Sequence, residues 1–435
     1  MKNKVINIGI DFGTCYSKVC FEDETKQKNH VKFYTDKTEY KHSKVYYEYS
    51  KKIFYYIKPE NVNSLETIKY FKYSTIDKSL PRSSQIPVSH PITSPEILCC
   101  VFFIACLIDQ SRKYIEKFYK KWYRSMPKFE FSITMGVPID NYSDKSHPMY
   151  DIILQTAIEL SNSDKLDKYS ISLNDLDEFY QKIQNINTPK FRESPNNTIS
   201  ELYAECLAFL YDDFVPEGLY AIIDIGGATI DMAVINKSHD ESNNNKFKYS
   251  IIAENIQPLG IEILIQKIAL NSETHNKIRK LIKSLNTDIE YNKNEEQNLS
   301  KKMRNAFAEM AINAKDKFRE ALIKRNGEMK VIICGGGYDY KWYKSCINKA
   351  KEQIKRTLAE VPNGFGLKFE DVDNLGRYYN SINHRLIISS GLAQDIQSIP
   401  DLDGFPWDFE KPVAKVINQE EILERVLIDN TGEIL

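Results

Sequence analysis

Residues that could form a metal centre of the zinc-finger type or a disulfide framework are scarce in this sequence. It has 7 His and 8 Cys among 435 residues, and no two Cys form a Cys-x-x-Cys pair. This excludes the usual structural zinc modules and disulfide-rich secreted domains. The N-terminal residues lead directly into a β-type segment, without the apolar core of a signal peptide. We therefore expect a cytoplasmic protein whose cysteines stay reduced.

An excess of charge and a long apolar run are also missing. Lys and Arg number 59 and Asp and Glu 60, so nothing indicates binding to nucleic acid or to an anionic membrane. The most apolar stretch, Ile97 to Ile108, is shorter than the roughly 20 residues that span a bilayer. Ser94, Pro95 and Glu96 before it are typical of a helix start, so we expect a buried helix over about 95–122.

Three clusters of glycine, two of them with aspartate, each follow a β-type run. They are Ile8 to Ser17 (IGIDFGTCYS), Ala221 to Asp231 (AIIDIGGATID) and Val331 to Tyr338 (VIICGGGY). Glycine permits sharp turns whose backbone N–H groups can bind an anion. One such cluster would be an ordinary turn, but the three together indicate a site for phosphates, hydrated magnesium and a nucleoside. The second cluster partly repeats the first, which predicts a duplicated half-domain.

Strand-type and helix-type segments alternate along the chain, which predicts an α/β fold with helices packed on the sheets. We expect irregular structure over 60–91 and a surface loop over 284–300. The segments 5–21 and 31–57 are predicted to be strands with hairpin-like breaks, and further strands are predicted at 129–138, 219–223, 230–235, 330–334 and 385–388. The predicted helices, besides 95–122, are 149–161, 200–211, 260–283, 301–325, 341–359 and a short one from Gly391.

The three clusters resemble the motifs of the actin-like ATPase superfamily, which includes actin, sugar kinases and the seventy-kilodalton heat-shock chaperones. The likeness is greatest to the chaperone nucleotide-binding domain. The first two clusters resemble its phosphate loops, with Cys15 where a second Thr is usual and Ala228 in place of a third Gly. The third cluster resembles its adenosine motif. Weaker matches extend the resemblance over roughly residues 5–395, at Ser94–Ile97, Ile133–Pro138, Ser200–Ala208 and Ser389–Ala393.

The resemblance implies two lobes with duplicated β-sheet and helix cores around a central nucleotide cleft. Lobe I would cover 1–217, with a small subdomain near 34–91. Lobe II would cover 218–390, with a small subdomain near 259–328. Residues 391–435 would return to lobe I and end in a tail rich in Pro and aromatic residues. We expect no peptide-binding domain of the chaperone type within these residues.

Roles follow from the resemblance for residues of the two phosphate loops. Asp11 and Asp224 would hold Mg²⁺ through water, an arrangement that suits the tightly bound hydration shell of this ion. Thr229 would also orient the attacking water. Backbone N–H groups for the phosphates would come from Gly13, Thr14, Cys15, Tyr16, Gly226, Gly227, Ala228 and Thr229.

Other roles rest on the weaker matches. Glu201 would position the attacking water, with Glu205 one helical turn later as the alternative. Lys72, or else Lys69, would lie near the γ-phosphate. Lys315 would contact the ribose. The adenosine and α-phosphate would lie against Gly335, Gly336 and Gly337. The family has Glu where this sequence has Ile312, so the base preference stays open.

The function that the resemblance implies is an ATP-binding, Mg²⁺-dependent, chaperone-like ATPase with slow turnover, using ATP and ADP. It would act as a conformational switch for a protein partner. Three alternatives stay open: a filament-forming actin-like protein, a small-molecule kinase of the same superfamily, and a nucleotide-binding pseudo-ATPase without turnover.

Overall fold

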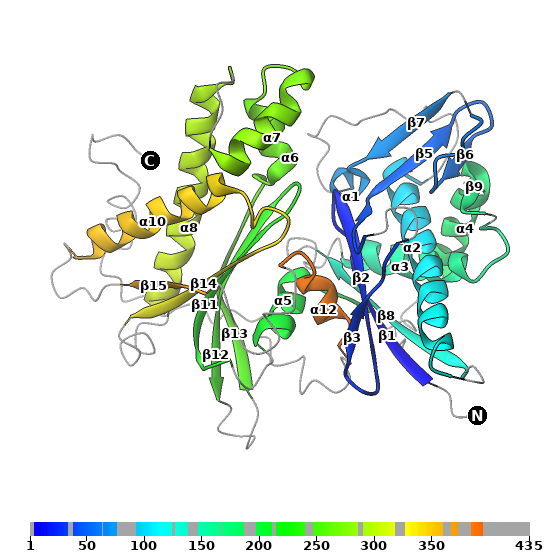
Figure 1. Cartoon of the computed structure of the whole chain (residues 1–435), viewed down its shortest axis with the longest axis horizontal. Coiled ribbons are helices and arrows are strands. Elements are labelled where there is room, and N and C mark those ends of the chain that lie inside the picture. The colour runs from blue at the N-terminus through cyan, green and yellow to red at the C-terminus, as the bar shows by residue number, and fades with distance from the viewer. Residues whose placement is uncertain are drawn as a thin grey trace. The chain divides into compact units, whose positions relative to one another are not determined.

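A computed structural model describes most of the chain up to residue 394 (Figure 1). Contacts divide the described residues into two compact units. The first is built from residues up to Ala208 together with a return segment that starts at Ile388, and the second from Phe209 to Ile387. The described residues are 4–33, 38–62, 64–75, 93–123, 127–137, 147–166, 168–186, 197–210, 215–239, 247–285, 290–317, 327–359, 367–372 and 384–394.

The main sheet of the first unit has β1 (Lys4–Asp11) near its centre. β1 pairs antiparallel with β2 (Tyr16–Asp23) and parallel with β8 (Phe129–Val137). The strand order is β10-β8-β1-β2-β3, with β4 also paired to β2. The remaining strands are β3 (Lys28–His30), β4 (Lys41–His42) and β10 (Asn197–Ser200).

The sheet of the second unit repeats this topology, in the order β13-β12-β11-β14-β15. Its first strand, β11 (Gly218–Ile225), again pairs antiparallel with the next strand, β12 (Ile230–His239), and parallel with a later one, β14 (Glu328–Cys334). β13 (Phe247–Gln257) and β15 (Lys368–Asp371) complete the sheet. The predicted α/β fold with duplicated sheet-and-helix cores is therefore confirmed, one core in each unit. Every residue of β11 is buried, as expected for a central strand.

The long helix α2 (Pro95–Lys120) of the first unit is the buried helix that the sequence predicts. Ser94 caps it, since its Oγ accepts a hydrogen bond from the N–H of Ile97 at 3.4 Å. All residues from Leu98 to Ile108 are fully buried, which explains the uniformly apolar run. Among the helices that the structure describes, none combines the length and the apolar character needed to cross a bilayer. The unit also contains α3 (His147–Ser161), α5 (Glu201–Leu210) and, at its boundary, α12 (Ile387–Leu392).

A second, four-stranded sheet lies within the first unit, in the order β7-β5-β6-β9. Its strands are β5 (Lys44–Glu48), β6 (Ile53–Tyr55), β7 (Leu65–Lys69) and β9 (Ser170–Ser172), and α1 (Phe71–Ser74) and α4 (Leu173–Ile186) follow β7 and β9. The prediction of irregular structure over 60–91 is therefore wrong for β7 and α1. β7 has one buried residue, Ile68, and becomes a strand by pairing with β5, which local sequence does not reveal.

Helices α6 to α8 of the second unit and α12 at the boundary of the first unit correct three predictions. The helix predicted over 260–283 is two helices, α6 (Ile261–Ile268) and α7 (His275–Ser284), with a short 3₁₀ turn between them. The loop predicted over 284–300 is wrong from Lys293, where α8 (Lys293–Lys317) begins. Its first turns are polar, yet Leu299 and Met303 are fully buried one turn apart. The strand predicted over 385–388 is wrong because α12 begins at Ile387. α10 (Lys341–Ala359) confirms its prediction.

Candidate nucleotide site

The first loop joins β1 to β2 and is held by Ser43. The Ser43 Oγ donates a hydrogen bond to the Gly13 carbonyl at 2.6 Å, and the Ser43 N–H donates to the Cys15 carbonyl at 2.9 Å. A trans peptide group carries its C=O and N–H on opposite sides. The N–H groups of Thr14 and Tyr16 therefore point away from Ser43, in the manner of an anion-binding turn.

Asp11, at the end of β1, is 2% exposed and faces a cation. Its partner across the hairpin is Lys18, whose Nζ lies 2.5 Å from the Asp11 Oδ2. The sequence prediction missed Lys18. The signal that could have revealed it is the spacing of seven residues, which a tight hairpin brings into register. Lysine is a common phosphate ligand, so the first loop combines turned N–H groups with a carboxylate and an ammonium group.

The second loop, between β11 and β12, is held by the start of helix α6. The N–H groups of residues 260–262 donate to the carbonyl oxygens of residues 226–228 at 2.8 to 3.1 Å. These bonds satisfy N–H groups that a helix start otherwise leaves without intrahelical partners. By the same peptide geometry, the N–H groups of residues 227–229 point away from α6. The Gly226 N–H instead closes the turn on the Thr229 carbonyl at 2.9 Å.

Asp224 and Asp231 stand directly opposite each other on β11 and β12, and each is 8% exposed. Side chains of such a pair lie on the same face, about 5 Å apart, and two like charges there destabilise the sheet. A divalent cation would offset that repulsion, and carboxylate oxygens are ligands that Mg²⁺ accepts, directly or through water. The donor set of the second loop therefore suits magnesium. Asp231, also missed by the sequence prediction, repeats the spacing of seven residues seen from Asp11 to Lys18.

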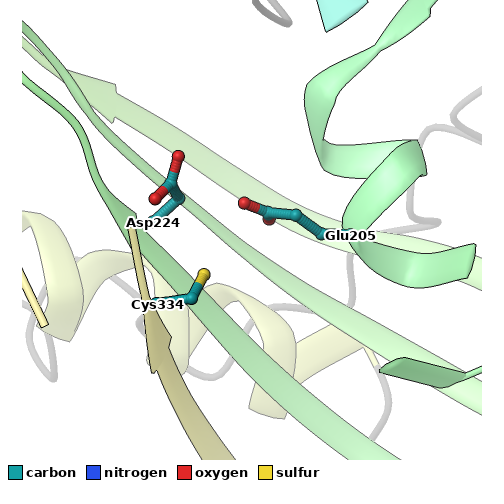
Figure 2. Close-up of side chains that lie close together, drawn as sticks. All are labelled: Glu205, Asp224 and Cys334. Carbon is teal, nitrogen blue, oxygen red and sulfur yellow. The ribbon is translucent and has the colours of Figure 1, made fainter. Parts of the chain in front are cut away.

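The third cluster lies beside the second in the same sheet. β14 runs parallel to β11, with Cys334 in register with Asp224 (Figure 2). A carboxylate oxygen of Asp224 lies within 4.8 Å of the Cys334 Sγ. The structure therefore brings two of the three glycine clusters to one end of one sheet.

Two of the three glycines in that cluster are required by packing alone. Gly335 has a φ of +79°, and a Cβ there would overlap the Asp224 carboxylate. A Cβ on Gly337 would overlap the Ile225 side chain. A Cβ on Gly336 would meet nothing closer than 3.7 Å. The run of glycines is therefore weaker evidence for a nucleoside contact than the sequence indicates, and Gly336 is the position that packing does not explain.

The structure brings Lys72 and Glu201 together, although they are 129 residues apart. The Lys72 Nζ lies 2.6 Å from the Glu201 Oε1, and the two side chains are 5% and 11% exposed. The Lys72 Nζ also lies 5.5 Å from the centroid of the Phe12 ring, the residue after Asp11. Glu201 packs against β8, since a Cβ on Gly136 would come within 2.9 Å of its Cγ.

The alternatives to these two residues differ in burial. Lys69 is exposed at the end of β7, whereas Lys72 is buried in α1. Glu205, which projects from α5 (Figure 2), is 1% exposed and is therefore more buried than Glu201, which is 9% exposed. Lys315 and Ile312 are both buried in α8, at 6% and 1% exposure. Ile312 thus offers no polar group for a base or ribose.

Cys15 is a natural chemical probe of the first loop. It is partly exposed, whereas the other seven cysteines are buried. Burial raises the pKa of the Cys20 thiol to about 12 and that of Cys346 to about 11, so these thiols stay protonated and unreactive near neutral pH.

We therefore expect a maleimide to label Cys15 first in the folded protein, and expect Mg²⁺–ATP to slow this labelling at least threefold. Peptide mass spectrometry after brief labelling measures both effects, with Cys15→Ser as the control. Faster labelling of any buried cysteine would contradict the described packing, and unchanged labelling with saturating Mg²⁺–ATP would argue against phosphate at the loop.

Comparison with protein-family models gives no match for this chain, and comparison with curated proteins gives none either. Solved structures that are similar include the crystal structure of MreB5 of Spiroplasma citri bound to ADP. The two chains are 13% identical, the match covers 90% of this chain and 95% of that chain, and the TM-score is 0.43. This likeness by itself assigns neither an activity nor a ligand to the present chain.

Proposed function

We propose that this chain is an ATP-binding, Mg²⁺-dependent ATPase that acts as a nucleotide-driven conformational switch for a protein partner. The observation that carries the proposal is the repeated construction of two loops. In each loop, carbonyl groups accept hydrogen bonds from a neighbouring segment, and N–H groups of the same loop point away from that segment. Each loop follows a central strand that carries a buried aspartate at or near its end. Asp11 is the last residue of β1, and Asp224 is the last but one of β11.

In this proposal the two loops bind the phosphates of one nucleotide. Lys18 and Lys72 supply positive charge for the phosphate oxygens. Asp11, Asp224 and Asp231 hold Mg²⁺ through its water shell, and the ion supplies charge neutralisation at the phosphates. Glu201 positions water once the Lys72 ammonium turns to phosphate. Preorganised donors of this kind are the main catalytic device in phosphoryl transfer.

The switch follows from the division of the chain into two units, since each carries one of the two loops. A ligand that contacts both loops binds some arrangements of the units better than others. It therefore shifts the population toward those arrangements, by no more than the difference in affinity. Loss of the γ-phosphate on hydrolysis changes that difference, and a partner that prefers one arrangement senses the change.

Isothermal titration calorimetry tests the binding step. We expect Mg²⁺–ATP and Mg²⁺–ADP to bind with one-to-one stoichiometry. AMP, which lacks the β- and γ-phosphates that the loops would hold, serves as the matched control and should bind at least tenfold more weakly. Absence of heat with ATP, ADP and GTP would overturn the proposal.

A nucleotide-binding protein without turnover is the second candidate, and the Lys72–Glu201 ion pair favours it. The Lys72 ammonium lies 2.6 Å from the Glu201 Oε1 and competes with water for that oxygen, so Glu201 is not free to position water while the pair is closed. Phosphate release by the wild-type protein separates the two candidates. Binding without Mg²⁺-dependent release would support the pseudo-ATPase.

A further inference from the structure

An aromatic stack adjoins the third glycine cluster and has no role in the function proposed so far. The rings of Tyr338 and His384 lie with centroids 3.6 Å apart and planes inclined by 16°. The Lys344 Nζ lies 3.9 Å from the centroid of the Tyr338 ring. All three side chains are partly exposed, so the stack lies at the surface of the second unit rather than in its core.

The stack is fixed to the turn by both backbone groups of Gly335. The Gly335 N–H donates to the His384 carbonyl, and the Tyr338 N–H donates to the Gly335 carbonyl, each at 3.3 Å. An ion pair of 3.4 Å between Arg385 and Asp339 joins the same two segments. The two rings are therefore held in one orientation before any ligand binds. Such preorganisation lowers the entropy that binding must offset.

We propose that the Tyr338–His384 stack is the platform for the base of the nucleotide, so that a purine adds one further layer to it. This inference rests on the proposed function, because it names the base-binding part of that site. Gly336 lies in the turn that carries the stack, and packing does not require glycine there, since a Cβ would meet nothing closer than 3.7 Å. A backbone without a side chain there lets a nucleoside lie close to the turn.

The platform also explains how a base can bind although Ile312 stands where the resemblance implies an acidic residue. Stacking uses the flat face of the base and does not read its hydrogen-bonding edge, so it tolerates different bases. Purines have the larger flat face. We therefore expect ATP and GTP to bind within about threefold of each other, and CTP to bind more weakly than both.

Titrations with ATP and with inorganic tripolyphosphate, both with Mg²⁺, test the platform. The variants are His384→Ala, His384→Phe and, as the matched control, His275→Ala, another partly exposed histidine of the same unit. We expect His384→Ala to weaken ATP binding about tenfold, within the range for loss of a base–aromatic stack. Tripolyphosphate binding should not change in any variant. His384→Phe, which keeps a stacking ring, should retain most of the affinity for ATP, and thermal unfolding verifies that each variant is folded.

The outcomes separate this inference from the proposed function. A wild-type protein that binds neither ATP nor tripolyphosphate overturns both. Unchanged affinity of His384→Ala for both ATP and tripolyphosphate overturns the platform alone, and means that the stack only secures the start of α10. Equal weakening for both ligands also overturns it, since the substitution then acts on the phosphate loops. Loss confined to ATP supports it.

Discussion

Asp224→Asn is expected to lower Mg²⁺-dependent ATP turnover at least about 100-fold, the lower end of the loss seen when one preorganised donor is removed from an oxyanion hole. The fold should survive the change. Asp224 and Asp231 are like charges on directly opposed positions of β11 and β12, and neutralising one of them relieves repulsion. We therefore expect the free energy of unfolding to stay within about 1 kcal/mol of the wild-type value or to rise.

Asp11→Asn provides the contrast, because its effect on stability has the opposite sign. Asp11 forms an ion pair with Lys18 in which the side chains are 3% and 13% exposed. Neutralising the carboxylate leaves the lysine charge without its counter-ion, and we expect a destabilisation of about 2 kcal/mol, below the loss of about 3–5 kcal/mol for a fully buried pair. Turnover should fall as in Asp224→Asn.

Phosphate release and urea unfolding of the two variants measure these effects. Turnover that is unchanged in both would show that the wrong carboxylates have been assigned. Equal destabilisation of both would contradict the charge arrangement described for the two hairpins.

Gly260→Ala is expected to disrupt the second loop without touching any predicted ligand group. Gly260 has φ −63° and ψ 168°, which any residue adopts, so the backbone conformation does not require glycine. The requirement is space. A Cβ would overlap the Ala228 carbonyl carbon and stand 2.6 Å from that of Gly227.

The loop must then move away from α6 and lose the three hydrogen bonds that hold its carbonyl groups. At about 1 kcal/mol each, these bonds predict a destabilisation of about 3 kcal/mol. Mg²⁺–ATP binding should weaken at least tenfold, because the N–H groups of the loop lose their common orientation.

Gly218→Ala is the matched control for this variant. Gly218 is the first residue of β11, at the end of this strand opposite the second loop, and its Cβ would meet only the Tyr220 side chain, at an ordinary 3.5 Å. Calorimetry and urea unfolding of the two variants should therefore differ clearly. A Gly260→Ala protein that binds ATP as the wild type does would show that the second loop takes no part in binding.

Prediction from sequence succeeded where a local pattern carries its own physical reason. Helix α2 was predicted because Ser94 and Pro95 mark a helix start and the run behind them is too apolar to be exposed. It failed where an element forms by pairing or packing with distant residues. β7 becomes a strand through β5, and the polar start of α8 contributes only every third or fourth side chain to the core, starting at Leu299.

The candidate site divides in the same way. The sequence alone determined that two aspartate-bearing turns recur after apolar strands. Glycine and aspartate at fixed offsets from a strand form a local pattern, which can be recognised without knowing which distant residues contact it. Tertiary structure decided which side chains face them. Hairpin register places Lys18 opposite Asp11 and Asp231 opposite Asp224. Lys72 contacts Glu201, which lies 129 residues later in the sequence. Hydrogen bonds of Gly335 hold the segments of Tyr338 and His384 together. Contacts of this kind depend on how the chain folds back on itself. A local sequence pattern does not specify which distant residues then become neighbours.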